Sequence, residues 1–276
     1  MLVAGFFFAV MGIGVKLGAS EFSALELVFY RSLFGLIFIA AIIKVRGGSL
    51  VTSHGRMHVS RGLSGLASLA FYFYAMTQLP VATAVTLNYT SPMFLTLVTV
   101  LWYRERVRPQ LFLAILLGFV GVILLLQPTI SESQLPAGLL GLTSGFLASI
   151  AYVNIKQLSA TGEPDWRVVF YFCLICTVIS GVILCFYEFH AISLRGAGIL
   201  LGIGACATVA QLALTRAYRV GKTLVVGSLA YSTVVFASVL GLVLLREVLP
   251  WSSWAGIAVI IVAGLFAVHE SGGTSD

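Results

Sequence analysis

The chain consists almost entirely of long apolar runs separated by short polar, Pro or Gly stretches. A helix needs roughly 20 apolar residues to cross about 30 Å of hydrocarbon. In lipid only α-helices and closed β-barrels satisfy their backbone hydrogen bonds, and these runs are continuous rather than alternating. We therefore expect an all-α transmembrane protein with ten membrane-spanning helices. The predicted spans cover approximately residues 2–18, 23–43, 60–79, 81–103, 109–127, 137–157, 166–187, 196–217, 223–245 and 251–268.

The composition excludes several functional classes. Of 276 residues, 59% are hydrophobic and 9% are charged, whereas a soluble domain carries about a quarter charged residues. No sizeable water-soluble domain fits between the runs. There is no P-loop, no paired acid and base and no metal-ligand cluster, so we expect no enzyme activity, no ATP hydrolysis, no cofactor and no metal. Four cysteines lie in apolar runs and are expected to pack helices: Cys173, Cys176, Cys185 and Cys206.

Short motifs recur in the second half of the chain at an offset of 140 to 142 residues. Several matches in order indicate a duplication. Each unit holds five predicted spans, and because five is odd the two copies enter the membrane from opposite sides. This predicts inverted repeats over residues 1–127 and 137–270, followed by a tail over 271–276. The matches pair Gly5 with Gly145, Lys16 with Lys156, Tyr30 with Tyr171, Tyr89 with Tyr231 and Arg104 with Arg246.

The basic residues predict the orientation, because cytoplasmic loops are enriched in Lys and Arg. With the N-terminus inside, twelve Lys and Arg residues lie at inner loops and helix ends and three at outer ones. Both termini are therefore expected in the cytoplasm. This distribution also explains the net charge of +6 by contact with the lipid bilayer, without a nucleic-acid partner.

A set of short motifs runs through the predicted spans: Tyr30-Arg31-Ser32, Ala75-Met76-Thr77-Gln78-Leu79-Pro80, Thr90-Ser91-Pro92, Tyr103-Arg104-Glu105-Arg106, Gly118-Phe119-Val120-Gly121-Val122, Leu245-Arg246-Glu247 and Ala263-Gly264. With these motifs the chain resembles the drug/metabolite transporter superfamily, in its ten-helix EamA-like branch. The resemblance implies a small-molecule transporter that works by alternating access. It is most similar to bacterial exporters of aromatic and other neutral amino acids, which implies the bacterial inner membrane. The oligomeric state stays open, with a monomer among the alternatives.

Two alternatives remain. A carrier of anionic or drug-like metabolites would need Lys16 and Lys156 to face the cavity. A receptor or scaffold would need a domain outside the membrane, and the runs leave little room for one.

Polar residues inside the spans follow single helical faces, as a cavity lining would. Hydroxyls, amides and aromatic rings together suit a zwitterion with an apolar or aromatic side chain. The alternatives are that small polar residues join helices and that tyrosines form an interfacial belt. The candidate substrate-binding residues are Tyr72, Gln78, Asn88, Tyr89, Ser91, Tyr152, Thr208, Gln211, Thr215, Ser228 and Tyr231.

Four further residues have a predicted gating or structural role. Lys16 and Lys156 attract a substrate carboxylate, close a gate, or extend to the interface. Arg31 is expected to pair with a carbonyl or with Glu26. Pro92 is expected to kink the fourth span, whereas its repeat mate is a valine.

The titratable groups predict transport without proton coupling, because carriers that move protons place such groups at membrane depth. We expect every acid in a loop or near a span end, and His54, His58, His190 and His269 in loops or the tail.

Overall fold

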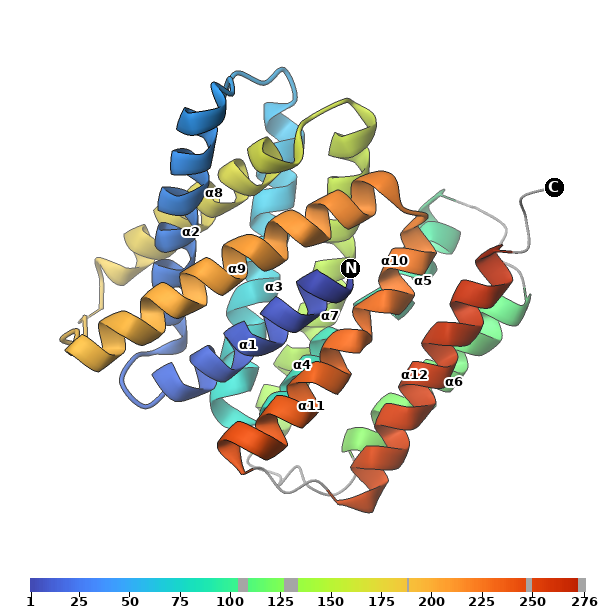
Figure 1. The fold of residues 1–276 in the computed structure, drawn as a ribbon. Coiled ribbons are helices and arrows are strands. Elements are labelled where there is room, and N and C mark those ends of the chain that lie inside the picture. The colour runs from blue at the N-terminus through green and yellow to red at the C-terminus, as the bar shows by residue number, and fades with distance from the viewer. Residues whose placement is uncertain (104–108, 127–133, 188, 247–249, 273–276) are drawn as a thin grey trace.

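The structure is a computed structural model that describes residues 1–103, 109–126, 134–187, 189–246 and 250–272, and it is entirely α-helical over these ranges (Figure 1). The helices are α1 (Leu2–Gly18), α2 (Ala24–Arg46), α3 (Gly55–Gln78), α4 (Val81–Asn88), α5 (Ser91–Tyr103), α6 (Pro109–Leu126), α7 (Leu135–Ala160), α8 (Asp165–Leu184), α9 (Leu194–Val220), α10 (Thr223–Ala230), α11 (Ser232–Leu245) and α12 (Trp251–Gly272).

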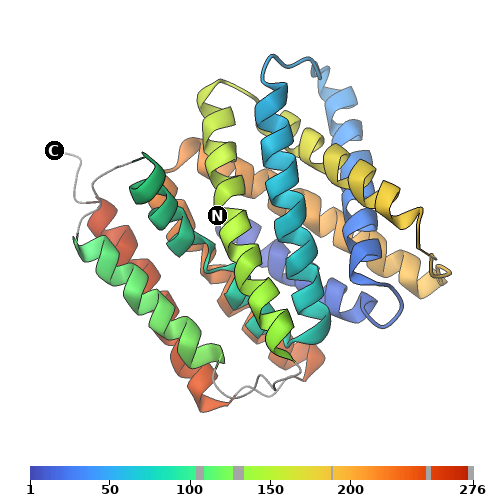
Figure 2. The same ribbon diagram turned by 180° about the vertical axis from the view of Figure 1, so that it is seen from behind.

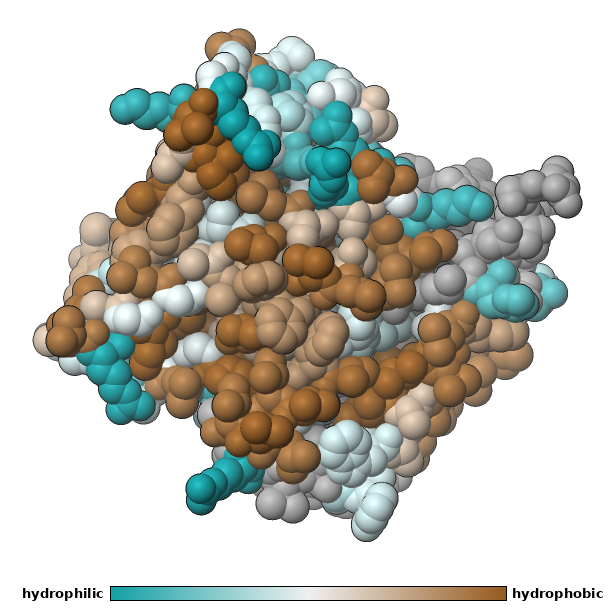
Figure 3. All heavy atoms as spheres, in the orientation of Figure 1, coloured by the Kyte–Doolittle hydropathy of each residue, from teal (hydrophilic) through white to brown (hydrophobic). Residues whose placement is uncertain are grey.

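Several of these segments are long and apolar enough to cross a membrane. Five such segments occur in the described ranges, and two shorter apolar helices, Leu2–Gly18 and Trp251–Phe266, accompany them. Figure 3 shows a broad hydrophobic surface, with hydrophilic side chains gathered towards its edges. The predicted all-α membrane protein is confirmed, while the count of ten spans stays a prediction.

The loop between the second and third predicted spans is shorter than predicted from their apolar runs, which end at 43 and resume at 60. Ser23 and Glu26 form a capping box that starts α2, as expected for a span that begins at residue 23. Gly47, with φ of +65°, ends α2 after Arg46, and α3 begins at Gly55. Charged residues continue both helices beyond the apolar runs, so the loop predicted from hydropathy alone is longer than the loop in the structure.

The helices of the two chain halves interleave. In Figures 1 and 2, α1 lies against α9 and α11, while α7 lies against α3 and α5. α2 packs on α8, and α6 packs on α12 at one edge of the bundle. Each of these pairs joins one half of the chain to the other, so the centre of the bundle is built by both halves.

Two of the predicted spans are each interrupted near the middle. The fourth is divided into α4 and α5 at Tyr89 and Thr90, and the ninth into α10 and α11 at Tyr231. The chain leaves the helix just before Pro92, which has no N–H to offer the Asn88 carbonyl four residues earlier. The two interruptions fall at the matched tyrosines of the sequence repeat.

A glycine from a neighbouring helix contacts each interruption. A Cβ added to Gly145 in α7 would lie 2.8 Å from the Leu87 carbonyl and 2.9 Å from the Asn88 carbonyl, and would also meet Thr90. A Cβ added to Gly5 in α1 would lie 2.8 Å from the hydroxyls of Ser232 and Thr233. Backbone therefore packs directly on backbone at Gly145, which leaves no space for a side chain.

This contact predicts that Gly145→Ala destabilises the protein. The added methyl group meets backbone atoms that cannot rotate away, and such overpacking costs about 1–3 kcal/mol. Thermal unfolding in detergent should show a lower Tm. The control is Gly198→Ala on α9, where an added Cβ meets nothing within 4 Å. Equal melting temperatures for the two variants would contradict the close contact.

Candidate functional site

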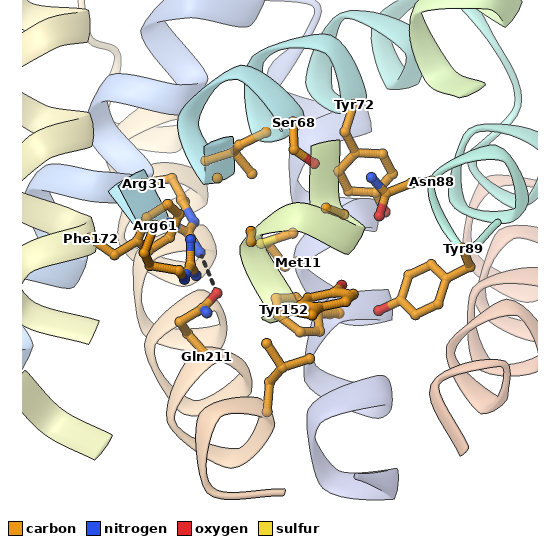
Figure 4. Close-up of a pocket in the computed structure, with 16 residues that line it drawn as sticks. Met11, Arg31, Arg61, Ser68, Tyr72, Asn88, Tyr89, Tyr152, Phe172 and Gln211 are labelled. Carbon is orange, nitrogen blue, oxygen red and sulfur yellow. Dashed lines mark hydrogen bonds between the residues drawn. The ribbon is translucent and has the colours of Figure 1, made fainter. Parts of the chain in front are cut away.

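A cavity lies at the centre of the bundle, between the two chain halves (Figure 4). Its volume is about 70 Å³, which is room for a few water molecules. Side chains of α1, α2, α3, α4, α7, α8 and α9 surround it. The lining residues are Phe8, Met11, Arg31, Arg61, Gly65, Ser68, Leu69, Tyr72, Asn88, Tyr89, Ala148, Ala151, Tyr152, Phe172, Gln211 and Leu214.

Two arginines form one side of this cavity. Arg31 is 2% exposed and Arg61 is 3% exposed. Their guanidinium carbons lie 5.1 Å and 4.0 Å from the centroid of the Phe172 ring, a distance at which a cation is attracted to an aromatic face. Arg31 Nη2 donates to Gln211 Oε1 at 3.5 Å. The Nε and Nη1 atoms of both arginines have no hydrogen-bond partner within the described part of the chain.

The expected pairing of Arg31 with Glu26 is wrong. Residues five apart on an α-helix lie about 140° around the axis from each other, so the two side chains leave α2 on different faces. The Glu26 carboxylate accepts hydrogen bonds from the backbone N–H of Ser23 and of His190, each at 2.8 Å. Arg31 points into the cavity instead, as Figure 4 shows.

Arg61 was absent from the predicted site because it was assigned to the inner end of the third span. Its helical position carried the signal, since Arg61, Gly65, Ser68 and Tyr72 follow one another at steps of four, three and four and all line the cavity. This face shares Tyr72 with the predicted substrate-binding residues, whereas Gln78 lies off it. A basic residue at the start of a polar helical face therefore indicates a cavity-lining side chain.

Aromatic and amide groups form the opposite side of the cavity, where Tyr72, Asn88 and Tyr89 lie across from the arginines (Figure 4). Asn88 Nδ2 donates to Ser144 Oγ at 2.9 Å, so its position is fixed against α7. The Tyr72 hydroxyl is buried and has no hydrogen-bond partner in the described residues. The Tyr152 ring is stacked on that of Tyr218, with centroids 4.9 Å apart.

Of the eleven predicted substrate-binding residues, five line the cavity, five lie elsewhere, and one lies outside the described side chains. Tyr72, Asn88, Tyr89, Tyr152 and Gln211 belong to the lining. The hydroxyls of Thr208 and Thr215 donate to backbone carbonyls one turn earlier in α9. Two more residues, Ser91 and Tyr231, are buried but lie outside the lining. The side chain of Gln78 is exposed. Ser228 lies in α10, but its side chain is outside the described residues.

Lys16 and Lys156 bond to the ends of two equivalent helices. Lys16 Nζ donates to the Leu79 carbonyl at 2.8 Å and to the Met76 carbonyl at 3.3 Å, at the end of α3. Lys156 Nζ donates to the Tyr218 and Gly221 carbonyls at 3.3 Å and 3.4 Å, at the end of α9. A cation at a helix C-terminus is stabilised by the helix dipole. Neither lysine lines the cavity.

A charged cluster surrounds Glu163, which follows α7. Arg167 Nη1 donates to its carboxylate at 2.9 Å, His58 Nε2 lies 3.5 Å from it, and Thr52 donates a hydrogen bond. The prediction that His58 lies in a loop is wrong, because α3 begins at Gly55 and His58 is buried within it. Burial raises the pKa of Glu163, but the hydrogen bonds from Thr52 and Arg167 outweigh burial and hold the pKa below its ordinary value.

The lowered pKa predicts that Glu163→Gln destabilises the protein near neutral pH. A folded-state pKa below the unfolded value gives stability that is present above the unfolded pKa and is lost as pH falls through the folded pKa. Loss of hydrogen bonds to a charged group costs about 1.5–3 kcal/mol. The Tm of the variant should be lower at pH 7, and the difference should shrink only as pH falls below the ordinary pKa of a glutamate, about 4.3, towards the lowered pKa of the folded state.

The matched control is Glu21→Gln. Glu21 is partly exposed, its ion pair with Arg195 spans 4.0 Å, and its one close bond is from the exposed Ser193 hydroxyl at 2.7 Å, for which a glutamine keeps an acceptor oxygen. The change should therefore have little effect at any pH. A Tm difference for Glu163→Gln that did not shrink on acidification below the ordinary pKa of a glutamate would argue against a charged Glu163.

The sequence model of the EamA-like transporter family matches residues 1–127 and 135–268. The chain belongs to the EamA-like transporter family. This confirms the resemblance found in the sequence and makes the protein a small-molecule membrane transporter. The cavity between the halves is accordingly the candidate substrate site.

The relatives transport chemically different molecules. The chain is 32% identical over 263 residues to a pseudopaline exporter of Pseudomonas aeruginosa, covering 95% of this chain and 92% of that one. It is 27% identical to a riboflavin transporter of Brucella anthropi, covering 90% and 89%, and 23% identical to an S-adenosylmethionine uptake transporter of Rickettsia prowazekii, covering 89% and 83%. The substrate must therefore be inferred from the cavity itself.

A solved crystal structure shares the fold. It has a TM-score of 0.77 and 18% sequence identity, and the match covers 99% of both chains. At this identity the likeness concerns the fold and leaves the substrate open.

Proposed function

We propose that the protein exports amino acids or closely related small metabolites across the bacterial inner membrane by alternating access. Ten spans in two inverted repeats and cytoplasmic termini belong to this proposal. The observation that carries it is the central cavity, which is lined by both halves of the chain and lies beside an interrupted span at Tyr89.

Repeated contacts support the inverted duplication. Lys16 bonds to the carbonyls of residues 76 and 79, and Lys156 bonds to those of residues 218 and 221, each 142 positions later. Gly5 and Gly145, which are also matched, each contact an interrupted span. In addition, the family model matches the chain in two stretches close to the predicted halves. Equivalent residues thus make equivalent contacts on both sides of the bundle.

The interruptions support alternating access. In transporters built from inverted repeats, discontinuous helices at matching positions mark the substrate site near the middle of the membrane. Here the α4–α5 break carries Tyr89 into the cavity lining, and the α10–α11 break lies at its repeat mate Tyr231. Because a helix break is a natural hinge, each half can open one side of the cavity in turn.

The lining suits a molecule with a carboxylate and an apolar or aromatic part. The guanidinium groups of Arg31 and Arg61 can donate hydrogen bonds to a carboxylate. Phe8, Met11 and Leu69 offer apolar contact to the rest of the molecule. Export is the proposed direction because the pseudopaline exporter is similar over nearly the whole chain. The anionic-carrier alternative placed Lys16 and Lys156 in the cavity. Neither lysine lines it, and its positive charge comes from Arg31 and Arg61 instead.

The proposed orientation predicts the labelling of single cysteines. In a background that lacks the four native cysteines, Ala191→Cys in the α8–α9 loop should react with a membrane-impermeant maleimide in intact cells. Ser53→Cys in the α2–α3 loop should react only after permeabilisation, because the two loops lie at opposite ends of the bundle (Figure 1). Labelling of Ser53→Cys in intact cells would reverse the orientation.

The proposed site predicts that Tyr72→Phe weakens transport without weakening the fold. The Tyr72 hydroxyl faces the cavity without a described partner, so its removal costs the protein little and costs the substrate one hydrogen bond. A loss of about 0.5–1.5 kcal/mol should raise the KM for amino-acid uptake into proteoliposomes several-fold. The probes are a panel of labelled aromatic, other neutral and acidic amino acids.

Tyr74→Phe is the control for this variant. Tyr74 lies on the same helix but is 41% exposed on the outer face, so its KM should not change. Equal KM values for both variants would remove Tyr72 from the site. Absence of transport for every amino acid in the panel would overturn the proposed function.

A further inference from the structure

The cavity holds two positive charges that no carboxylate in the described part of the chain neutralises. No acidic residue is among the described lining residues of the cavity. The acidic side chains that the structure describes bind other partners, namely Glu21 with Ser193, Glu26 with His190, Glu163 with Arg167 and Asp165 with Arg219. Arg31 and Arg61 instead lie over the same Phe172 ring. Their Nε and Nη1 atoms, four N–H nitrogens in all, are left without protein acceptors in the described structure.

Two like charges in one small cavity disfavour the empty site. Each buried ion loses several kcal/mol of hydration unless a counter-charge and hydrogen bonds replace the water, and the two arginines also repel each other. The Phe172 face and the long bond from Arg31 to Gln211 compensate only in part, since neither carries a negative charge. A ligand with negative charge therefore supplies what the site lacks.

We propose that this arginine pair recognises small dianions with two carboxylate groups. A dicarboxylate makes the site neutral and offers four oxygen atoms to the free guanidinium nitrogens. A neutral amino acid has one carboxylate and leaves the site positive, with its own ammonium group close to two arginines. This inference rests on the proposed transport function and narrows its substrates to the acidic members of that class.

The geometry assigns different tasks to the two sides of the cavity. Arg31 and Arg61 bind the carboxylates, because a guanidinium presents parallel N–H donors that match carboxylate oxygens. Tyr72 and Asn88 lie across the cavity (Figure 4) and meet the rest of the molecule. The apolar residues between them favour a short carbon chain over a heavily hydroxylated one.

The test is a charge series of nearly constant size, measured by calorimetry on the purified full-length protein in detergent. The probes are succinate with two negative charges, succinamate with one and succinamide with none. We expect affinity to fall about tenfold for each charge removed, the equivalent of about 1.4 kcal/mol per step. Equal affinities for the three probes, or no binding by any of them, would overturn the proposal.

Variants locate the effect. Arg31→Gln and Arg61→Gln should each abolish the preference for succinate over succinamate. Arg31→Lys keeps the charge but loses the parallel N–H donors of the guanidinium, so it should retain part of that preference. Arg46→Gln removes the same charge at the exposed end of α2 and should bind all three probes as the parent protein does. Loss of the preference in Arg46→Gln would show that the cavity is not its source.

The stability of the unliganded variants separates recognition from a structural role. Removing one of two unneutralised buried charges should leave the Tm of Arg31→Gln unchanged or higher. A lower Tm together with an unchanged preference among the probes would make the arginines structural and overturn the proposal. Amino-acid transport that is unaffected by Arg31→Gln would overturn it as well, yet leave the transport function standing. Dicarboxylate binding with no transport of any tested substrate would support recognition by the arginine pair and overturn the transport function.

Discussion

Lipid cannot donate hydrogen bonds, so every helix end inside this bundle needs a donor from the protein itself. Lys16 and Lys156 meet that need at the ends of α3 and α9, where each ammonium group binds two backbone carbonyls. These bonds fix the points from which the interrupted spans begin. Because α4 and α10 start directly after these ends, the two lysines bind where each interrupted span begins, and the α4–α5 break then carries Tyr89 into the cavity lining.

Glycine provides the second condition for a helix break inside the bundle. At Gly145 the backbone of α7 lies against the carbonyls of Leu87 and Asn88, and a side chain there would force the halves apart. Close backbone contact of this kind replaces the hydrophobic effect, which does not drive helices together in lipid. Lys and Gly thus act together, the first by satisfying helix ends and the second by covering the interruptions.

Much of the fold could be predicted because hydropathy and helix length are fixed by the bilayer. The helix starting after Ser23 agrees with its predicted span, whereas the end of α2 and the start of α3 extend beyond hydropathy because charged residues continue the helices. The residues that line the cavity are less predictable from the sequence than the helices are. Tyr72 and Gln211 were found from helical periodicity, but Arg61 was read as a membrane-end charge, and Thr208 satisfies its own helix. Periodicity identifies a face, and only packing tells whether that face meets a cavity or another helix.

The Arg31 and Phe172 pair explains how a duplicated scaffold can hold a one-sided site. The two residues align in the proposed repeats, and in the structure the guanidinium of one lies 5.1 Å from the ring centre of the other. Equivalent residues meet in this way only near a pseudo-two-fold axis. Two arginines at those positions would add a further charge to a buried cavity, whereas a phenylalanine supplies a surface on which both Arg31 and Arg61 rest. The gates of such a transporter can stay alike, while its substrate is determined by the few central positions where the halves differ.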